Sequence, residues 1–331
     1  MTVLEAIQKS TEFLARKGVD FPRLQTELLL AHLLRLPRMK LYLDFERALT
    51  PAETDALREL VRRRGQREPL QHLTGSTSFC GFEIAVNRHA LVPRPETELL
   101  AELGWKFLAA LSDGSERRPP VRREAGEPQE PAVPEAGAPI ALDFGTGTGC
   151  IAIALAAKCP SAKIVATDIS PDALVLAEEN AARNQVAERI EFRQGDGLAA
   201  LPGESEGGAP RRPDSAKEER DSRSSPLRSF DLIISNPPYI PSAEVATLQP
   251  EVRDFDPRAA LDGGADGLDF YRRLAREAKP FLKPHGRIML EFGDGQADAV
   301  RKLFEAEKWI VEAVQPDYSQ RQRILVAALS R

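Results

Sequence analysis

The chain lacks the features that mark secreted, membrane-spanning and metal-binding proteins. Its 331 residues include three cysteines, which are too few and too scattered for a disulfide framework or a zinc site. The four histidines show no metal-ligand spacing, so we expect no metal. No run of about 18 apolar residues occurs, and the first residues lack the basic start and apolar core of a secretory signal. We therefore expect a cytoplasmic monomer that does not bind membranes.

The chain also lacks an excess of positive charge. Lysine and arginine total 45 against 50 aspartates and glutamates, which gives a net charge of −5. Proteins that bind nucleic-acid phosphates usually present a strongly basic face, so direct binding of nucleic acid is not expected. The densest basic run extends from Arg58 to Arg67 and is typical of a solvated helix face. A docking surface for a protein partner is the alternative interpretation of that run.

The N-terminal part is predicted to be helical. Apolar residues keep helical spacing over residues 2–66, and Thr50 to Glu53 combine a helix cap, a proline at the first helical position and a capping box. Residues 69–95 are strand-like and predict a hairpin linker. We therefore expect a helical domain over residues 1–68, a linker over 69–95 and a larger domain over 96–331.

From residue 140 onward, short apolar runs alternate with helical segments, which is typical of an α/β fold with a parallel sheet. Toward the end we predict a helix over 271–283, a strand over 286–292, a helix over 297–308 and a closing pair of strands over 309–314 and 323–329. The last strand is expected to run antiparallel in the otherwise mostly parallel sheet. Residues 112–138 and 202–229 are too poor in apolar side chains to offset the entropy of ordering, so we predict disordered inserts there.

The tetrapeptide Asn236, Pro237, Pro238 and Tyr239 follows an apolar run, 230–235, that predicts a buried strand. Two consecutive prolines fix two φ angles and remove two N–H donors, so the carbonyl oxygens of Asn236 and Pro237 are free to face a ligand. Asn236 adds a side-chain amide oxygen, and Tyr239 adds an aromatic face. Such a set of acceptors suits a planar group that bears an NH₂. In the alternative interpretation, the tetrapeptide is only a turn with Tyr239 packed underneath it.

A glycine-rich loop, Asp143 to Gly149, follows another predicted strand and precedes a helix of small residues. Glycines let the backbone approach a ligand at the carboxyl end of a strand. The spacing differs from that of dinucleotide-binding loops, and the lysine of a phosphate-binding loop is absent. The cofactor contacts predicted in this loop are Gly145, Thr146, Gly147, Thr148 and Gly149.

Acidic residues end the next two predicted strands. Asp168 lies about 20 residues beyond the loop, at a spacing typical of an acid that accepts hydrogen bonds from ribose hydroxyls. Asp168 also lies in the cap region of the helix predicted to begin near Pro171, and the two roles are compatible. Asp196, which Gly197 follows, is placed to reach an adenine amino group, although an ordinary loop acid would look the same. These loops carry no lysine or arginine to neutralise a pyrophosphate, so they suit a cofactor with an adenosine end and no phosphate, such as S-adenosylmethionine.

Together these motifs resemble those of the class I S-adenosylmethionine-dependent methyltransferases, and the resemblance implies their Rossmann-like sheet. Other segments resemble the HemK/PrmC family within that class, namely residues 67–75, 79–83 and 92–98. The resemblance covers nearly the whole chain except the two inserts. It implies methyl transfer from S-adenosylmethionine to the glutamine N5 of the Gly-Gly-Gln motif in class 1 peptide chain release factors. One departure is visible, because the family often has an aromatic residue where Gly197 follows Asp196.

The chemistry of an amide acceptor assigns roles to the site residues. The catalytic set is expected to be Asn236, Pro237 and Tyr239, with Asn236 also next to the cofactor. The Asn236 side chain and the Pro237 carbonyl would accept the two N–H hydrogens of the acceptor amide, and Tyr239 would wall one side of its plane. No strong general base is required, because a methylated amide that has gained positive charge is very acidic. Pro238, Arg94 and Glu96 are expected to contact the substrate, although a helix start with a proline and early acids also explains residues 94–98.

Three alternatives remain open. The same acceptors would serve the exocyclic NH₂ of adenine, so the first is an adenine-N6 methyltransferase of nucleic acid; the sequence pI of about 5.6 counts against it. The second is a glutamine methyltransferase of a ribosomal protein, which the N-terminal resemblance disfavours. The third is a non-catalytic S-adenosylmethionine-binding protein, which the intact glycine loop, Asp168 and Asn236 disfavour.

Overall fold

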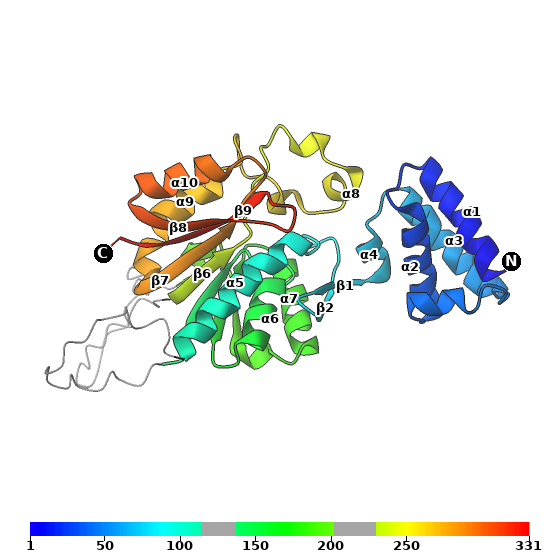
Figure 1. Ribbon diagram of the computed structural model, residues 1–331, viewed down its shortest axis with the longest axis horizontal. Coiled ribbons are helices and arrows are strands. Elements are labelled where there is room, and N and C mark those ends of the chain that lie inside the picture. The colour runs from blue at the N-terminus through cyan, green and yellow to red at the C-terminus, as the bar shows by residue number, and fades with distance from the viewer. Residues whose placement is uncertain (114–136, 202–229, 331) are drawn as a thin grey trace, which may run out of the picture.

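The computed structural model describes residues 1–113, 137–201 and 230–330 (Figure 1). This part of the chain forms a helical unit at the N-terminus, a short hairpin and an α/β unit built on a seven-stranded sheet. The two predicted inserts, 112–138 and 202–229, lie outside the described residues apart from 112–113 and 137–138. No described helix is both long and apolar enough to cross a membrane.

The N-terminal helices pack around an apolar cluster of their own (blue in Figure 1). They are α1 (Val3–Arg16), α2 (Pro22–Leu34), the 3-10 helix η1 (Arg38–Tyr42) and α3 (Pro51–Gly65). The predicted capping box is present, because the Thr50 hydroxyl accepts from the Glu53 backbone N–H and the Glu53 carboxylate accepts from the Thr50 N–H. The helical prediction for residues 2–66 is confirmed.

A hairpin connects this unit to the sheet. It consists of β1 (Ser76–Phe79) and β2 (Phe82–Ala85), which pair antiparallel. The turn between them places Cys80 at φ 51° and Gly81 at φ 85°, the two positive angles that let a two-residue turn follow the twist of its strands. The predicted hairpin is therefore present within residues 69–95.

The strand-like prediction is wrong at the start of that range. Residues 70–74 form a short helix, α4 (Leu70–Thr74), between the N-terminal unit and the hairpin. Pro69 precedes the helix with its φ fixed at −55°, and Gly75 ends it at φ 79°, an angle that favours glycine. A helix of five residues is too short for the period of its apolar residues to distinguish it from a strand.

The central sheet has the strand order β5-β4-β3-β6-β7-β9-β8. Its first five strands in this order pair parallel, whereas β9 runs antiparallel to both of its neighbours. The predicted mostly parallel sheet with an antiparallel last strand is confirmed. The bounds are β3 (Ile140–Phe144), β4 (Lys163–Asp168), β5 (Ile190–Gln194), β6 (Phe230–Ser235), β7 (Leu282–Glu291), β8 (Trp309–Pro316) and β9 (Gln322–Leu329).

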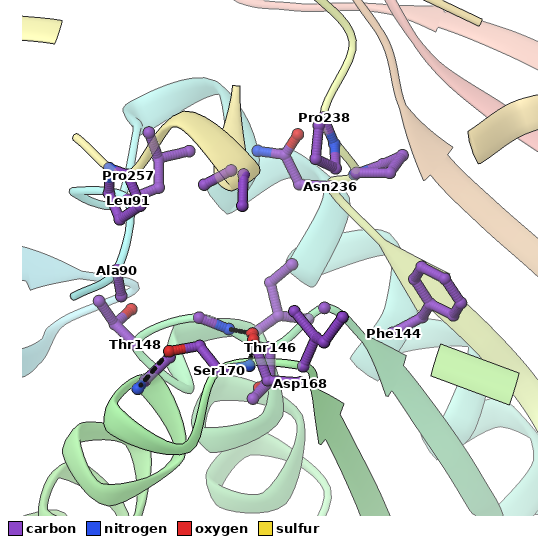
Figure 2. Close-up of a pocket in the computed structure, with 18 of the residues that line it drawn as sticks. Ala90, Leu91, Phe144, Thr146, Thr148, Asp168, Ser170, Asn236, Pro238 and Pro257 are labelled. Atoms are coloured by element: carbon purple, nitrogen blue, oxygen red, sulfur yellow. Dashed lines mark hydrogen bonds between the residues drawn. The ribbon is translucent and has the colours of Figure 1, made fainter. Parts of the chain in front are cut away.

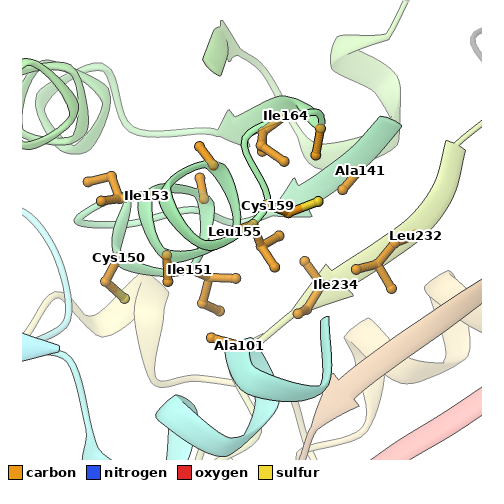
Figure 3. Packing of buried hydrophobic residues seen from close by; sticks show 14 of the residues in the cluster. Ala101, Ala141, Cys150, Ile151, Ile153, Leu155, Cys159, Ile164, Leu232 and Ile234 are labelled. Carbon is orange, nitrogen blue, oxygen red and sulfur yellow. The ribbon is translucent and has the colours of Figure 1, made fainter. Parts of the chain in front are cut away.

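Helices cover both faces of the sheet. Along β6, Leu232 and Ile234 pack into one buried cluster with α5 (Pro95–Ser112) and α6 (Cys150–Lys158), as Figure 3 shows. Ile233 points the other way, into a second cluster with α9 (Asp269–Glu277) and α10 (Ala297–Ala306). Burial on both faces explains why the middle of β6, Leu232 to Ile234, is continuously apolar rather than alternating.

The remaining helices are short except for one. They are α7 (Pro171–Arg183), η2 (Ala187–Arg189), η3 (Gly197–Ala200), η4 (Val245–Thr247), α8 (Pro250–Arg253), η5 (Arg258–Ala260) and η6 (Lys279–Phe281). The elements η4, α8 and η5 belong to a long connection between β6 and α9, and Figure 1 shows α8 on the side of the molecule that faces the N-terminal helices.

The predicted helix over residues 271–283 is wrong at its end. The α-helix α9 stops at Glu277, a 3-10 turn follows, and β7 already begins at Leu282. Pro280 has no backbone N–H to donate to a carbonyl one turn earlier, so it ends the regular helix. The predicted strand over 286–292 is therefore present as β7 but begins four residues earlier.

Candidate functional site

A pocket opens at the carboxyl ends of β3, β4, β5 and β6, the edge where parallel sheets of this kind bind ligands. Of the predicted site residues, Gly145, Thr146, Gly147, Thr148, Asp168, Asp196, Gly197, Asn236, Pro237, Pro238 and Arg94 line it. Figure 2 shows Asn236 and Pro238 on one side of the pocket, and Thr146, Thr148 and Asp168 on the other. Three predicted residues, Gly149, Tyr239 and Glu96, are not among its lining residues.

The glycine loop is held in place by two neighbouring elements. The backbone N–H groups of Gly145 and Thr146 both donate to the Thr167 carbonyl of β4, at 2.9 Å each. Below the loop, Asp143 is buried and its Oδ2 accepts from the Thr146 hydroxyl at 2.6 Å and from the Ala152 N–H at 3.2 Å. Burial raises the pKa of Asp143 to about 7. These contacts fix the loop before any ligand arrives.

Gly149 does not line the pocket but allows two helices to pack closely. It precedes α6 with φ at 80°, and a Cβ built there would lie 3.0 Å from the Ala177 Cβ and 3.2 Å from the Ala177 Cα. Ala177 belongs to α7, so the glycine lets two helices approach closely. The other two loop glycines, Gly145 at φ 72° and Gly147 at φ 55°, do line the pocket.

Asp168 faces the pocket from the end of β4 and braces the glycine loop. Its Oδ2 accepts from the Gly147 N–H at 2.8 Å, and its Oδ1 accepts from the Ser170 N–H at 2.9 Å. Ser170 itself caps α7 by accepting from the Ala173 N–H. Asp168 therefore lies in the cap region of α7 and in the pocket wall at once, and the two interpretations of this residue are compatible.

The acid at the end of β5 is paired with an arginine. Asp196 accepts hydrogen bonds from Arg273 of α9 at both its Oδ1 and its backbone carbonyl. Arg273 in turn lies with its guanidinium carbon 5.9 Å from the centre of the Phe144 ring. The pocket therefore has an arginine behind Asp196 that the loop sequences alone did not reveal.

An aromatic side chain from β3 occupies the space next to Gly197. A Cβ built on Gly197 would lie 1.9 Å from Cε2 of Phe144, and Gly197 has φ at 58°. The Phe144 ring lines the pocket and packs edge-on against Phe270, with 6.4 Å between ring centres. Phe144 therefore lies beside Gly197 in the pocket, a position that the sequence reasoning did not predict. The signal was available as the unusual glycine at 197.

This arrangement predicts that Gly197 and Phe144 are energetically coupled. Gly197→Ala should lower the free energy of unfolding by about 1–3 kcal/mol, because the new methyl overlaps the ring and the positive φ disfavours alanine. Urea denaturation of Gly197→Ala, Phe144→Ala and the double variant measures the coupling. The penalty of Gly197→Ala should shrink in the Phe144→Ala background. Equal penalties in both backgrounds would show that the ring does not occupy the space at residue 197.

The Asn236 side chain is anchored by one end. Its Nδ2 donates to the Thr97 hydroxyl oxygen at 3.0 Å, which leaves Oδ1 as the acceptor of the amide. Thr97 is buried and lines the same pocket, although the sequence prediction did not single it out. It lies in the first turn of α5, so this helix positions the tetrapeptide that follows β6.

Tyr239 packs beneath the tetrapeptide. Its side chain packs against the cluster around α9 and α10, and burial raises the pKa of its phenol to about 12. Its carbonyl accepts from Gln296 Nε2 at 2.9 Å. This placement agrees with the alternative interpretation of Tyr239, whereas Asn236, Pro237 and Pro238 form part of the pocket wall.

The start of α5 is tied to the long connection after β6. Arg94 lines the pocket and forms an ion pair with the buried carboxylate of Asp256 at 2.7 Å. Glu96 lies on the same turn, is exposed and is not among the lining residues. Ala259 and Ala260 of η5 and the neighbouring Pro257 also line the pocket, and Figure 2 shows Pro257 next to Leu91, across the pocket from Thr146 and Asp168.

Most arginines of the basic run from Arg58 to Arg67 form ion pairs with acidic side chains. Arg58 and Arg62 are exposed and bond acids one turn away, as expected for a solvated helix face. Arg64 is buried instead, with 3% of its surface exposed, and donates to Glu251 of α8 at 2.7 Å. Arg67 donates to the other oxygen of Glu251 at 2.6 Å. The N-terminal unit and the connection after β6 are therefore joined through one carboxylate.

Comparison with known proteins adds an independent finding. A family model described as "PrmC N-terminal domain" matches residues 5–75, and one described as "Methyltransferase domain" matches residues 138–325. Among solved structures, a methyltransferase from Pyrococcus furiosus aligns with 77% of this chain and 92% of that chain, at 17% identity and a TM-score of 0.44.

Full-length relatives are much more similar. A protein of Geobacter sulfurreducens named "Release factor glutamine methyltransferase" is 40% identical over 303 residues, which cover 92% of this chain and 88% of that protein. Proteins with the same name from Chlorobaculum tepidum and Cereibacter sphaeroides are 38% and 37% identical. They cover 97% and 99% of this chain, and 95% and 99% of their own length. Similarity of this extent includes both the helical unit and the sheet.

Proposed function

Because the chain belongs to the family of release factor glutamine methyltransferases, we propose that it methylates the side-chain amide nitrogen (N5) of the glutamine in the Gly-Gly-Gln motif of class 1 peptide chain release factors. The methyl donor in this proposal is S-adenosylmethionine. The observation that carries it is the position of Asn236, which faces the glycine loop and Asp168 across one pocket (Figure 2). A methyl acceptor and a methyl donor must meet in such a space.

The residues of the pocket fit an adenosine cofactor that bears no phosphate. Among the described residues, the lysine and arginine side chains that line the pocket are limited to Arg94, which forms an ion pair with Asp256. We infer that Asp168 accepts from ribose hydroxyls and that Asp196 and Phe144 hold the purine. Glycines in the loop from Gly145 to Thr148 let its backbone come close to the cofactor.

The chain's own residues act on the acceptor amide. When bound, S-adenosylmethionine supplies an electrophilic methyl group on a sulfonium. An amide nitrogen is a poor nucleophile, because its lone pair is delocalised into the carbonyl. We infer that Asn236 Oδ1 and the Pro237 carbonyl accept its two N–H hydrogens, which orients the nitrogen and favours positive charge on it. The methylated amide cation is acidic enough to release its proton to water.

A division of labour along the chain belongs to the same proposal. In this proposal, residues 1–68 recognise the release factor and residues 96–331 catalyse the methyl transfer. Residues 69–95 link the two domains. The separate apolar cluster of the N-terminal helices supports this division, because a unit with its own core can present a surface independently of the sheet. The match of residues 5–75 to a family model of an N-terminal domain points the same way.

The proposal predicts a specific product. Mass spectrometry of a release factor treated with the protein and S-adenosylmethionine should show one added methyl group on the glutamine of Gly-Gly-Gln. A release factor in which alanine replaces that glutamine is the matched control and should stay unmodified. DNA and RNA oligomers and purified ribosomal proteins should be offered in parallel. Methylation of adenine or of a ribosomal protein, with the release factor unchanged, would replace this function with one of the alternatives.

A further inference from the structure

One side chain of α7 joins the hairpin to the glycine loop. Asn180 has no exposed surface. Its Oδ1 accepts from the Ala85 N–H at 2.7 Å, and its Nδ2 donates to the carbonyls of Ala85 and Thr148, at 3.0 Å each. Ala85 is the last residue of β2, whereas Thr148 lines the pocket. A single amide therefore bonds two segments that lie 95 and 32 residues before it in the chain.

The two bonds to Ala85 resemble the pairing of one strand with another. In an antiparallel pair, alternate residues direct both their N–H and their carbonyl away from the partner strand. Val86 donates to the Gly75 carbonyl on the β1 side, so its neighbour Ala85 directs its own groups to the opposite edge of β2. Such an edge needs hydrogen-bond partners where it is buried. The Asn180 amide supplies both partners and so docks the hairpin on α7.

The bond to the glycine loop holds the last peptide group of that loop. The Thr148 carbonyl and the Gly149 N–H belong to one peptide group, and this N–H donates to the Thr146 carbonyl at 2.9 Å. Asn180 holds the other end of the same group. A reversed Asn180 amide would place Oδ1 against two carbonyl oxygens, and two acceptors do not bond. The neighbours of Asn180 therefore fix the direction of its amide.

The chain that follows the hairpin forms part of the pocket wall. Ala90 packs against Ala173 and Leu176 of α7, and it lines the pocket together with Leu91 (Figure 2). A Cβ built on Gly147 would lie 3.8 Å from the Ala90 Cβ, so this wall closely faces the glycine loop. Both walls rest on α7, and one residue of that helix bonds the chain on each side.

We propose that Asn180 is a positioning residue through which docking of the hairpin and binding of S-adenosylmethionine favour each other. With the hairpin docked, the Ala85 N–H engages Oδ1, and Nδ2 stays directed at the Thr148 carbonyl. Without the hairpin, the amide is free to rotate, and the pocket wall at Thr148 loses its fixed donor. Because coupling between two sites is reciprocal, a bound cofactor must in turn stabilise the docked hairpin.

The inference rests on the proposed function, because S-adenosylmethionine is the methyl donor of that proposal. It concerns the donor side of the pocket and not the acceptor. It extends the proposed function by making the linker a part of the cofactor site, and its tests need no release factor.

The first test uses the full-length wild-type protein. Saturating S-adenosylmethionine should slow amide hydrogen exchange in peptides that cover β1 and β2, because a ligand stabilises the state to which it binds. Residues 76–85, all of which the structure describes, do not line the pocket, so direct contact with the cofactor does not explain such slowing. Mass spectrometry of the exchanged peptides measures it. Unchanged exchange in the hairpin would overturn the inference.

The second test removes the amide. Asn180→Ala should raise the calorimetric Kd for S-adenosylmethionine roughly tenfold, within the range typical of coupled sites. In this variant the cofactor should no longer slow exchange in the hairpin. A loss of stability alone would speed exchange with and without cofactor, but it would not separate the hairpin from the pocket.

Asn184→Ala is the matched control. Asn184 follows one turn later, and its Nδ2 donates to the Glu83 carbonyl of β2 at 3.0 Å and to the Asn180 carbonyl at 2.9 Å. Its replacement removes an asparagine contact with the same edge of β2 but leaves the contacts of the Asn180 amide in place. The Kd should change little, and the cofactor should still slow exchange in the hairpin.

The outcomes distinguish this inference from the proposed function. A raised Kd in Asn180→Ala but not in Asn184→Ala, with loss of the cofactor effect on the hairpin, supports the role of Asn180. An unchanged Kd in Asn180→Ala, or an equal loss of affinity in Asn184→Ala, overturns it. If Asn180→Ala fails to fold, exchange in the wild-type hairpin decides. A wild-type protein that binds the cofactor but leaves the release factor unmodified overturns the proposed function alone, and one that does not bind the cofactor overturns both.

Discussion

Replacing Asn236 with alanine should lower kcat for release factor methylation by roughly 10²-fold or more, the loss typical of removing one preorganised polar group from a transition state. The Asn236 amide is held through its Nδ2 by Thr97 before the substrate binds. Its Oδ1 therefore needs no reorganisation when positive charge develops on the acceptor nitrogen. Truncation removes this acceptor and leaves the Pro237 carbonyl to orient the amide alone.

The affinity for S-adenosylmethionine distinguishes a role of Asn236 toward the acceptor from a role toward the cofactor. Its Kd, measured by calorimetry in the absence of release factor, should be nearly unchanged in Asn236→Ala, because the proposed contact is to the acceptor. Asn236→Asp tests the chemistry further, since a carboxylate cannot donate to Thr97. A variant that loses cofactor affinity as severely as kcat would reassign Asn236 to the cofactor.

Replacing Asp168 with alanine should weaken S-adenosylmethionine binding roughly tenfold to a hundredfold, equivalent to about 1.5–3 kcal/mol for hydrogen bonds to a charged group. The carboxylate is placed to accept from ribose hydroxyls at the end of β4. It also accepts from the backbone N–H groups of Gly147 and Ser170, so the variant should lose some thermal stability too. Calorimetry and thermal unfolding measure the two effects separately.

Asp172→Ala provides the control for that experiment. Asp172 lies four residues further on, in the first turn of α7, is exposed and does not line the pocket. Asp172→Ala removes one negative charge from this region, as Asp168→Ala does. Equal affinity in Asp168→Ala and the wild-type protein would contradict the ribose assignment, whereas a matching loss in Asp172→Ala would point to long-range electrostatics.

The sheet could be predicted because its strands are buried on both faces. Runs such as Phe230 to Ser235 are mostly apolar, and each is followed by a loop with glycine, proline or an acid. The elements that the prediction missed or misplaced are those in which local signals are weak. The five residues of α4 and the boundary between α9 and β7 depend on Pro69, Gly75 and Pro280 rather than on a hydrophobic period.

The site could be predicted only where its residues are consecutive. The glycine loop and the tetrapeptide after β6 each form a continuous motif, and most of their residues line the pocket. Thr97 could not be assigned to Asn236, because 139 residues separate the two along the chain. The close approach of the Phe144 ring to Gly197 is a packing relation between residues at the ends of two different strands, and only the fold brings them together.

The bond between the N-terminal helices and the connection after β6 limits how the molecule can bend. Arg64 and Arg67 each hold one oxygen of Glu251, and Asp256, five residues further on, is held by Arg94 at the pocket. A rotation of the N-terminal helices relative to the sheet must therefore break both ion pairs to Glu251 or move α8 with the helices. Because η5 and Pro257 follow directly, a load applied to the helices by a docked protein is transmitted to the pocket rim. The mouth of the pocket is thus mechanically linked to the N-terminal helices.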